Sequence, residues 1–255
     1  MIQPLILSIA GEKSGVGKTT LGAGLVSYLT GSEFPDAKNL SMLAPPKTVG
    51  VIKYTRTALL ASLTDAPHLI DQPDKDTALY HAAGAAKVLW MQSPPEDLPA
   101  LLAHALQQLG MYDIVLVEGN SPIEFLRPDA VICIVSSDAV PVKQSAGKAL
   151  QEADLIAVAP GGSFSDNARA VPVVYLPDLL HQTDSGALHP LVQRMDDILI
   201  KKKIAALLTE RAENGRISCT AARSIAEELG VAYAMIGTAA NELNIKVNHC
   251  ELGCF

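Results

Sequence analysis

The 255-residue sequence has no long hydrophobic run, since apolar segments such as residues 114–117 and 130–135 are far shorter than the roughly 20 residues that span a bilayer. The N-terminus lacks the basic segment that begins a secretory signal, and a phosphate-loop motif follows it at once. These absences argue against a membrane-spanning helix and predict a cytoplasmic protein. The apolar residues, 49% of the chain, are then expected to fill a core.

Positive charge is scarce as well. The chain has 20 Lys and Arg residues against 27 Asp and Glu residues, which gives a formal net charge of −7. Because dedicated nucleic-acid-binding domains are usually strongly basic, this balance disfavours DNA or RNA as a partner. The apolar fraction lies far above that of disordered chains and predicts a folded protein.

Cysteine is sparse, and no Cys-x2-Cys pair occurs. Four cysteines are too few for a disulfide framework in a chain of this length, so in a reducing compartment we expect thiols or metal ligands. Cys133 lies inside an apolar run and is expected in the core. The other three fall near the end of the chain, at Cys219, Cys250 and Cys254.

Short apolar segments alternate with longer helical patterns from Pro4 to about Pro177, an order typical of βαβ units. Several of these segments are uninterrupted, as in strands that helices cover on both faces. We predict strands at residues 5–10, 48–53, 87–91, 113–118, 130–135, 155–158 and 171–175, and helices at residues 18–29, 76–84, 96–109 and 143–153. The predicted fold class is α/β, a doubly wound and mostly parallel sheet.

The C-terminal part of the chain differs in composition. A helical stretch over residues 191–208 leads into it, and we expect one domain over residues 1–200 and a second over residues 201–255. Ser218 precedes an alanine-rich helix that Gly230 stops, and a second helix at residues 232–243 leads to a short strand at 245–247. This order predicts a small helix-turn-helix-like domain.

Residues 11–20 read GEKSGVGKTT, directly after a predicted strand and directly before a predicted helix. In this context the backbone N–H groups of such a loop cradle phosphates, the lysine reaches the β- and γ-phosphates, and the following hydroxyl ligates Mg²⁺. A strict motif would have glycine in place of Glu12, so the loop is a variant. The expected nucleotide-binding residues are Gly15, Val16, Gly17, Lys18, Thr19 and Thr20, with Thr19 also on Mg²⁺.

An acidic residue stands at each end of the apolar segment 113–118. Ligands bind beyond the carboxyl ends of strands in open parallel sheets, so we choose Glu118 over Asp113. Glu118 would hold Mg²⁺ through water and help to place the attacking water. The alternative is a carboxylate that only caps a buried strand.

The segment KSGVGKTT at residues 13–20 resembles the loop KGGxGK[S/T]T of the signal-recognition, MinD-type and BioD-like class of phosphate-loop NTPases, with Ser14 in place of a glycine. In that class the first lysine often reaches across a dimer to the partner's nucleotide. The resemblance implies a homodimer in which Lys13 stabilises charge in trans. The alternative is a solvated loop lysine.

Four further segments resemble the molybdopterin-guanine dinucleotide biosynthesis protein B family: VGVIK at 49–53, DQPDKDT at 71–77, AAGA at 82–85 and VEG at 117–119. Members of that family bind GTP or a related nucleotide and assist the attachment of a nucleotide to the molybdenum cofactor. The resemblance implies that Lys53 lies close to the nucleotide and that Lys75, Asp76 and Thr77 lie near the γ-phosphate.

The chain departs from this family mainly on the substrate side. Residues 54–56 read YTR where the family has histidines, residues 74–77 read DKDT in place of GKDS, and residues 120–121 read NS in place of FK. An Asn-Lys-x-Asp guanine signature is absent from the sequence after residues 155–158, so ATP and GTP both stay open.

The C-terminal domain allows two ligand predictions. The would-be recognition helix at residues 233–244 has no basic residue, which disfavours DNA because phosphate contacts supply most non-specific affinity. Cys219, His249, Cys250 and Cys254 could supply four ligands for zinc or an iron–sulfur cluster. The alternative for the cysteines is free thiols.

The phosphate-loop motif predicts a Mg²⁺-dependent nucleotide hydrolase or nucleotide-controlled accessory factor. The two resemblances imply that it is a homodimer and that it acts in molybdenum or tungsten cofactor biosynthesis, with a cofactor-biosynthesis enzyme as partner. Its catalytic candidates are Lys13, Lys18 and Glu118. One alternative is a MinD-type ATPase for nickel or iron–sulfur centre maturation, whose cysteine tail carries the metal. Another is a regulator that presents its helix-turn-helix in the nucleotide-bound dimer.

Overall fold

The computed structural model of the chain describes residues 3–31, 42–73, 75–136, 144–165, 170–176 and 188–248. These residues form two compact units. The second unit comprises residues 42–44 and 196–248, and the other described residues form the first unit. None of the described helices is long and apolar enough to cross a membrane. The predicted domain limit at residue 200 stays a prediction.

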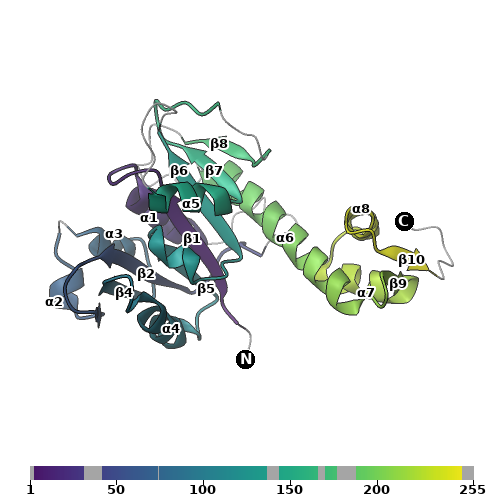
Figure 1. Cartoon of the computed structure of the whole chain (residues 1–255), viewed down its shortest axis with the longest axis horizontal. Helices are drawn as coiled ribbons and strands as arrows, with labels where there is room; N and C mark the ends of the chain where they lie inside the picture. The colour runs from purple at the N-terminus through teal and green to yellow at the C-terminus, as the bar shows by residue number, and fades with distance from the viewer. Residues whose placement is uncertain are drawn as a thin grey trace. The chain divides into compact units, whose positions relative to one another are not determined.

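The first unit is built on one sheet of eight described strands in the order β3-β4-β2-β5-β1-β6-β7-β8 (Figure 1). All neighbouring strands pair in parallel except β3 and β4, which are antiparallel. The strands are β1 (Leu5–Gly11), β2 (Val49–Arg56), β3 (Ser62–Thr64), β4 (Lys87–Ser93), β5 (Ile114–Glu118), β6 (Ala130–Val135), β7 (Leu155–Val158) and β8 (Val173–Tyr175). This arrangement confirms the predicted fold class.

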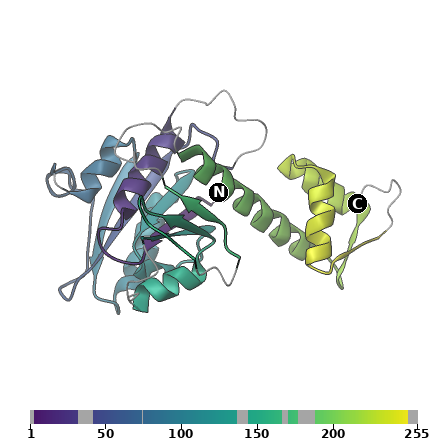
Figure 2. The same cartoon turned by 90° about the horizontal axis from the view of Figure 1, so that it is seen from above.

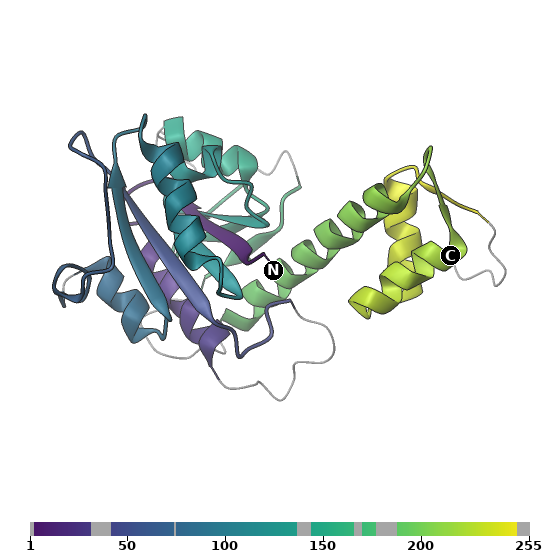
Figure 3. The same cartoon turned by 90° about the horizontal axis from the view of Figure 1, so that it is seen from below.

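Helices cover both faces of the sheet, with α1 and α3 on one face and α4 and α5 on the other (Figures 2 and 3). The helices of this unit are α1 (Lys18–Thr30), α2 (Pro67–Ile70), α3 (Asp76–Ala82), α4 (Leu98–Leu109), α5 (Gln144–Glu152) and the 3-10 helix η1 (Ser121–Glu124). The first turns of α6 (His189–Arg211) also belong to it. The sequence did not predict β3 or α2, because three and four residues are too few to show a period.

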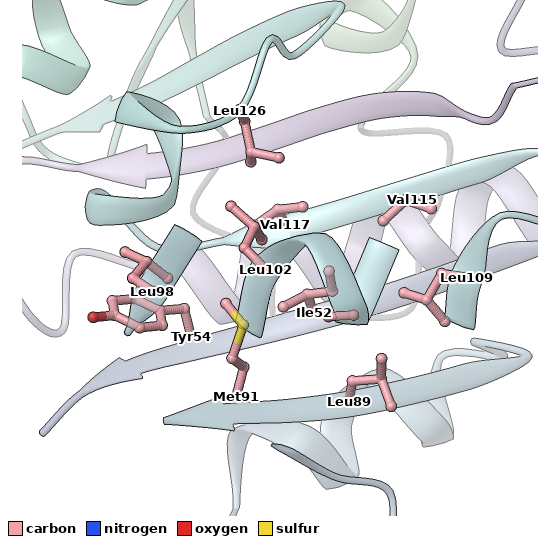
Figure 4. Close-up of a cluster of buried hydrophobic side chains, with 11 residues drawn as sticks. Ile52, Tyr54, Leu89, Met91, Leu98, Leu102, Leu109, Val115, Val117 and Leu126 are labelled. Carbon is pink, nitrogen blue, oxygen red and sulfur yellow. The ribbon is translucent and has the colours of Figure 1, made fainter. Parts of the chain in front are cut away.

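The packing of β2 and β5 against α4 determines to which face of the sheet Lys53 and Glu118 point. Figure 4 shows Ile52 and Tyr54 of β2 and Val115 and Val117 of β5 packed with leucines of α4. Successive side chains of a strand point to opposite faces of the sheet. Lys53 and Glu118 therefore point to the face that α1 and α3 cover.

The second unit packs the end of α6 against two shorter helices, α7 (Cys219–Leu229) and α8 (Tyr233–Glu242). Ser218 caps α7 by accepting a hydrogen bond from the amide of Ala221 at 3.1 Å, and Gly230 ends the helix with φ +58°. The strands β9 (Arg216–Ser218) and β10 (Lys246–Asn248) pair in parallel. β9 was not predicted, because Ser218 reads in the sequence as a helix cap only.

Candidate functional site

The loop between β1 and α1 depends on three glycines. Gly15 (φ +75°) and Gly17 (φ +101°) adopt left-handed backbone conformations that other residues rarely take. Gly11 is needed for space instead, since a Cβ there would lie 2.5 Å from Cγ1 of the buried Val16. Gly17 is the N-cap of α1, so the loop ends at unpaired helix amides, a favourable place for an anion.

Glu12, which the sequence presented only as a departure from the motif, anchors this loop to the end of β6. Its buried carboxylate accepts hydrogen bonds from the amide of Ser136 at 2.9 Å and from the Ser136 hydroxyl. The ammonium of Lys13 lies 3.3 Å from the same carboxylate. Burial by itself would raise the pKa of Glu12, but the bonds from Ser136 and Lys13 outweigh it and hold the pKa below its ordinary value.

The two lysines of the loop have different surroundings. Lys18 donates a hydrogen bond of 2.9 Å to the carbonyl oxygen of Lys13. Burial lowers the pKa of Lys18 and the Lys53 ammonium lowers it further, while the Glu118 carboxylate partly offsets both. The Lys13 side chain is 41% exposed, and its ammonium is paired with Glu12. Thr19 and Thr20 follow Lys18 in the first turn of α1.

Four of the predicted site residues meet at the loop. The Thr19 hydroxyl donates to the Glu118 carboxylate, at 3.2 Å from Oε1 and 3.1 Å from Oε2. The Lys53 ammonium lies 2.8 Å from Oδ2 of Asp76 and donates to the Thr19 hydroxyl at 3.2 Å. It also pairs closely with Oε1 of Glu118. The cluster therefore joins α1, β2, α3 and β5.

Tyr80 is a member of this cluster that the sequence analysis missed. Its buried hydroxyl donates a hydrogen bond of 2.8 Å to Oε2 of Glu118. Burial raises the pKa of Tyr80 well above its ordinary range, and the neighbouring Glu118 raises it further, so Tyr80 stays a proton donor. One signal could have found it: Asp76 and Tyr80 are four residues apart on a predicted helix and so share a face.

Lys75 and Thr77, which flank Asp76 in the chain, make contacts outside this cluster. The Lys75 ammonium sits 5.3 Å from the centre of the Trp90 ring, and the buried Thr77 hydroxyl donates to the carbonyl oxygen of Ile70. Of the three residues 75–77, only Asp76 joins the cluster. Asp74 lies outside the described residues.

Asp113 occupies the other end of β5 from Glu118. It accepts hydrogen bonds from the Thr48 amide at 2.8 Å and from the Thr48 hydroxyl at 2.7 Å. These bonds, the one from the amide first, lower the pKa of Asp113. Asp113 thus joins the amino ends of two strands, far along β5 from the loop.

Asn120 links the phosphate loop to a cavity on the α4 and α5 side of the sheet. Its side chain exchanges two hydrogen bonds with the backbone of Gly11, at 3.0 Å to the amide and 2.8 Å to the carbonyl oxygen. The same residue lines a cavity of about 770 Å³, together with Arg56, Phe125 and Lys148. Arg56 and Asn120 are two of the positions where the chain departs from the family it resembles.

The predicted C-terminal metal ligands cannot all be placed. Cys219 is the first residue of α7 and is buried. His249, Cys250 and Cys254 lie outside the described residues, and within the described part of the chain no three His, Cys, Asp or Glu residues form a group that could hold a metal ion. Cys133 is buried in the core, and burial raises the pKa of its thiol to about 12.

The chain matches no protein-family model and no curated protein. Several solved structures are similar to the chain, among them the following three. LpxK from Aquifex aeolicus in complex with ATP has 15% identity and a TM-score of 0.42, over 68% of this chain and 54% of that one. A LAO/AO transport system kinase has 16% identity and a TM-score of 0.41, over 95% and 70%. The signal recognition particle 54 kDa protein from Aeropyrum pernix K1 in complex with GDP has 16% identity and a TM-score of 0.38, over 90% and 58%.

These likenesses are distant, and the chain spans about half the length of the LpxK chain. The features of the chain itself therefore identify its fold. The parallel strand order around β1, the glycine loop between β1 and α1, and the carboxylate that ends β5 give it the fold of a phosphate-loop NTPase. The resemblance to the molybdopterin-guanine dinucleotide biosynthesis protein B family stays a prediction.

Proposed function

We propose that this chain binds and hydrolyses ATP or GTP together with Mg²⁺. The observation that carries the proposal is the meeting of Thr19, Lys53, Asp76 and Glu118 beside the glycine loop and the N-terminus of α1. A hydroxyl and two carboxylates are the oxygen donors that Mg²⁺ prefers, so the residues present fit this ion. When bound, Mg²⁺ would supply positive charge that neutralises the charge developing on the phosphates.

Other residues of the chain would then bind the phosphates, hold the metal and orient the attacking water. The loop amides and Lys18 hold the phosphates, Thr19 and Glu118 hold the metal, and Glu118 also orients the attacking water. Lys13 acts on the nucleotide of a second copy in a homodimer. The partial exposure of the Lys13 side chain, 41%, supports this role, because a residue that acts in trans must be accessible. The ammonium would have to leave its ion pair with Glu12 to do so.

We further propose that the nucleotide serves the biosynthesis of a molybdenum or tungsten cofactor, with a biosynthetic enzyme as partner. The segments around Lys53, Asp76 and Glu118 support this role through the family they resemble. The cavity at Asn120 adds a place for a second substrate, since it lies at the carboxyl ends of β2 and β5 and its lining residue Asn120 is hydrogen-bonded to Gly11 of the loop.

The test of nucleotide binding is calorimetry with ATP and with GTP in the presence of Mg²⁺, followed by phosphate release. Lys18→Ala should lower the affinity at least about tenfold, because a phosphate then loses its charged donor. Lys203→Ala is the matched control, since Lys203 is exposed on α6. Unchanged affinity in Lys18→Ala would refute the proposal.

A second candidate function is that of a MinD-type ATPase for nickel or iron–sulfur centre maturation. It is favoured by one feature, the His249-Cys250 and Cys254 tail in a chain whose Cys219 begins a helix. Elemental analysis of anaerobically purified protein tests it, beside the Cys250→Ser/Cys254→Ser variant. Stoichiometric metal that the variant loses would favour this function, and a protein without metal would favour the first.

A nucleotide-controlled regulator that binds DNA through α7 and α8 is the third candidate. The helix α8, which would be the recognition helix of a helix-turn-helix, contains no Lys or Arg. Phosphate contacts would then have to come from elsewhere, so we rank this function last. Binding to duplex DNA that falls steeply across a salt series would reverse this ranking.

A further inference from the structure

Lys53 lies in the middle of a set of oxygens of the kind that bind small cations. Its ammonium contacts Oγ1 of Thr19 at 3.2 Å, Oδ2 of Asp76 at 2.8 Å and Oε1 of Glu118. Lys53 and Glu118 are paired residues on the neighbouring strands β2 and β5, so the backbone fixes their approach. The Lys53 side chain is only 13% exposed.

Glu118 is held in one orientation. The Tyr80 hydroxyl donates to Oε2, which leaves Oε1 directed to the Lys53 ammonium. Tyr80 can reach this position only because residue 22 is glycine, since a Cβ there would lie 2.2 Å from the tyrosine oxygen. Glu118 is 1% exposed, and a carboxylate buried so deeply needs a cation beside it.

We propose that Lys53 is a built-in competitor of Mg²⁺ at this position, an inference that rests on the proposed binding of Mg²⁺ and nucleotide. The ammonium and the divalent ion need the same oxygens of Thr19, Asp76 and Glu118. Without nucleotide the lysine keeps them. With nucleotide the ammonium turns to a phosphate oxygen and releases them to the metal.

The charges of the cluster explain why nucleotide is required. Lys53, Asp76 and Glu118 together carry a formal charge of −1. The ammonium of Lys18 is also close, since the Lys53 ammonium lowers the pKa of Lys18. A divalent ion added to this group would face two ammonium groups at short range. The phosphates supply the negative charge that lets both lysines and the metal stay together, so metal and nucleotide bind as a pair.

The test measures Mn²⁺ binding to the nucleotide-free protein by electron paramagnetic resonance. Lys53→Met leaves Asp76 and Glu118 without their cation, and we expect it to bind Mn²⁺ at least about tenfold more tightly than the unaltered chain. The gain should disappear in Lys53→Met/Glu118→Gln. Lys87→Met is the matched control, because Lys87 is another strand lysine paired with a carboxylate, Asp65 at 3.1 Å, and should show no gain.

Each outcome decides the inference. Mn²⁺ affinity of Lys53→Met that is equal to or below that of the unaltered chain would overturn it. If Lys53→Met does not fold by circular dichroism, Lys53→Gln takes its place, and failure of both to fold would show that the lysine only neutralises Glu118. Nucleotide binding by the unaltered chain is measured separately, so failure of this inference is distinguishable from failure of the proposed function.

Discussion

Gly22 on α1 and Tyr80 on α3 fit together so closely that a Cβ at position 22 would lie 2.2 Å from the tyrosine hydroxyl oxygen. That oxygen in turn donates to Oε2 of Glu118 at 2.8 Å. The pair joins two helices at a buried point and directs the carboxylate toward Lys53. Two residues outside the phosphate loop thus set the geometry of the site.

Gly22→Ala should destabilise the fold by about 1–3 kcal/mol, because the added methyl group overpacks a buried contact. Alanine is the better helix former, so propensity alone would predict the opposite sign. Gly147→Ala in α5 is the matched control, since a Cβ there would meet nothing within 4 Å. We expect that control to be stabilised by about 0.5–1 kcal/mol in urea unfolding. Equal shifts in the two variants would contradict the close fit.

Tyr80→Phe removes only a hydroxyl group and should cost about 1.5–3 kcal/mol of unfolding free energy, because it deprives a buried carboxylate oxygen of a hydrogen bond. Tyr175→Phe serves as the control, since that side chain is 61% exposed and should change stability by less than about 0.5 kcal/mol. Chemical denaturation of both variants at neutral pH gives the comparison. A loss in Tyr80→Phe no larger than in the control would show that the hydrogen bond adds nothing.

Glu12→Gln should remove the part of the free energy of unfolding that depends on the ionisation of Glu12. The folded protein lowers the pKa of Glu12, so its ionised form contributes stability above the ordinary glutamate pKa of about 4.3 and loses it as the pH falls through the lower, folded value. The free energy of unfolding of the unaltered chain should therefore be higher than that of the variant at neutral pH. This difference should shrink below about pH 4. Unfolding curves at several pH values measure this, and a constant difference would refute it.

Lys13→Ala should leave nucleotide affinity within about twofold while it lowers the rate of hydrolysis by at least about tenfold, because the charge it supplies acts on the partner's nucleotide. The variant should also fail to form the nucleotide-bound dimer. Calorimetry measures the affinity, phosphate release the rate of hydrolysis, and light scattering with nucleotide present the dimer. Full turnover in the variant would make Lys13 a surface residue of the loop.

Much of the fold could be predicted from the sequence. Two strands, at residues 130–135 and 155–158, were predicted to the residue, since uninterrupted apolar segments carry a strong local signal. The short strands β3 and β9 could not, because pairing between distant segments stabilises them and three residues carry no period. The strand predicted at residues 245–247 corresponds to β10, but its parallel pairing with β9 was not predicted.

The sequence by itself determined the glycine loop, the helix after it and the carboxylate at the end of β5, because each depends on residues adjacent in the chain. Only the tertiary structure decided that Tyr80 and Gly22 would hold Glu118, and that Lys53 would lie among three oxygens from three other elements. The physical reason is register: Lys53 pairs with Glu118 across β2 and β5, and a shift of one residue would turn either side chain to the opposite face of the sheet.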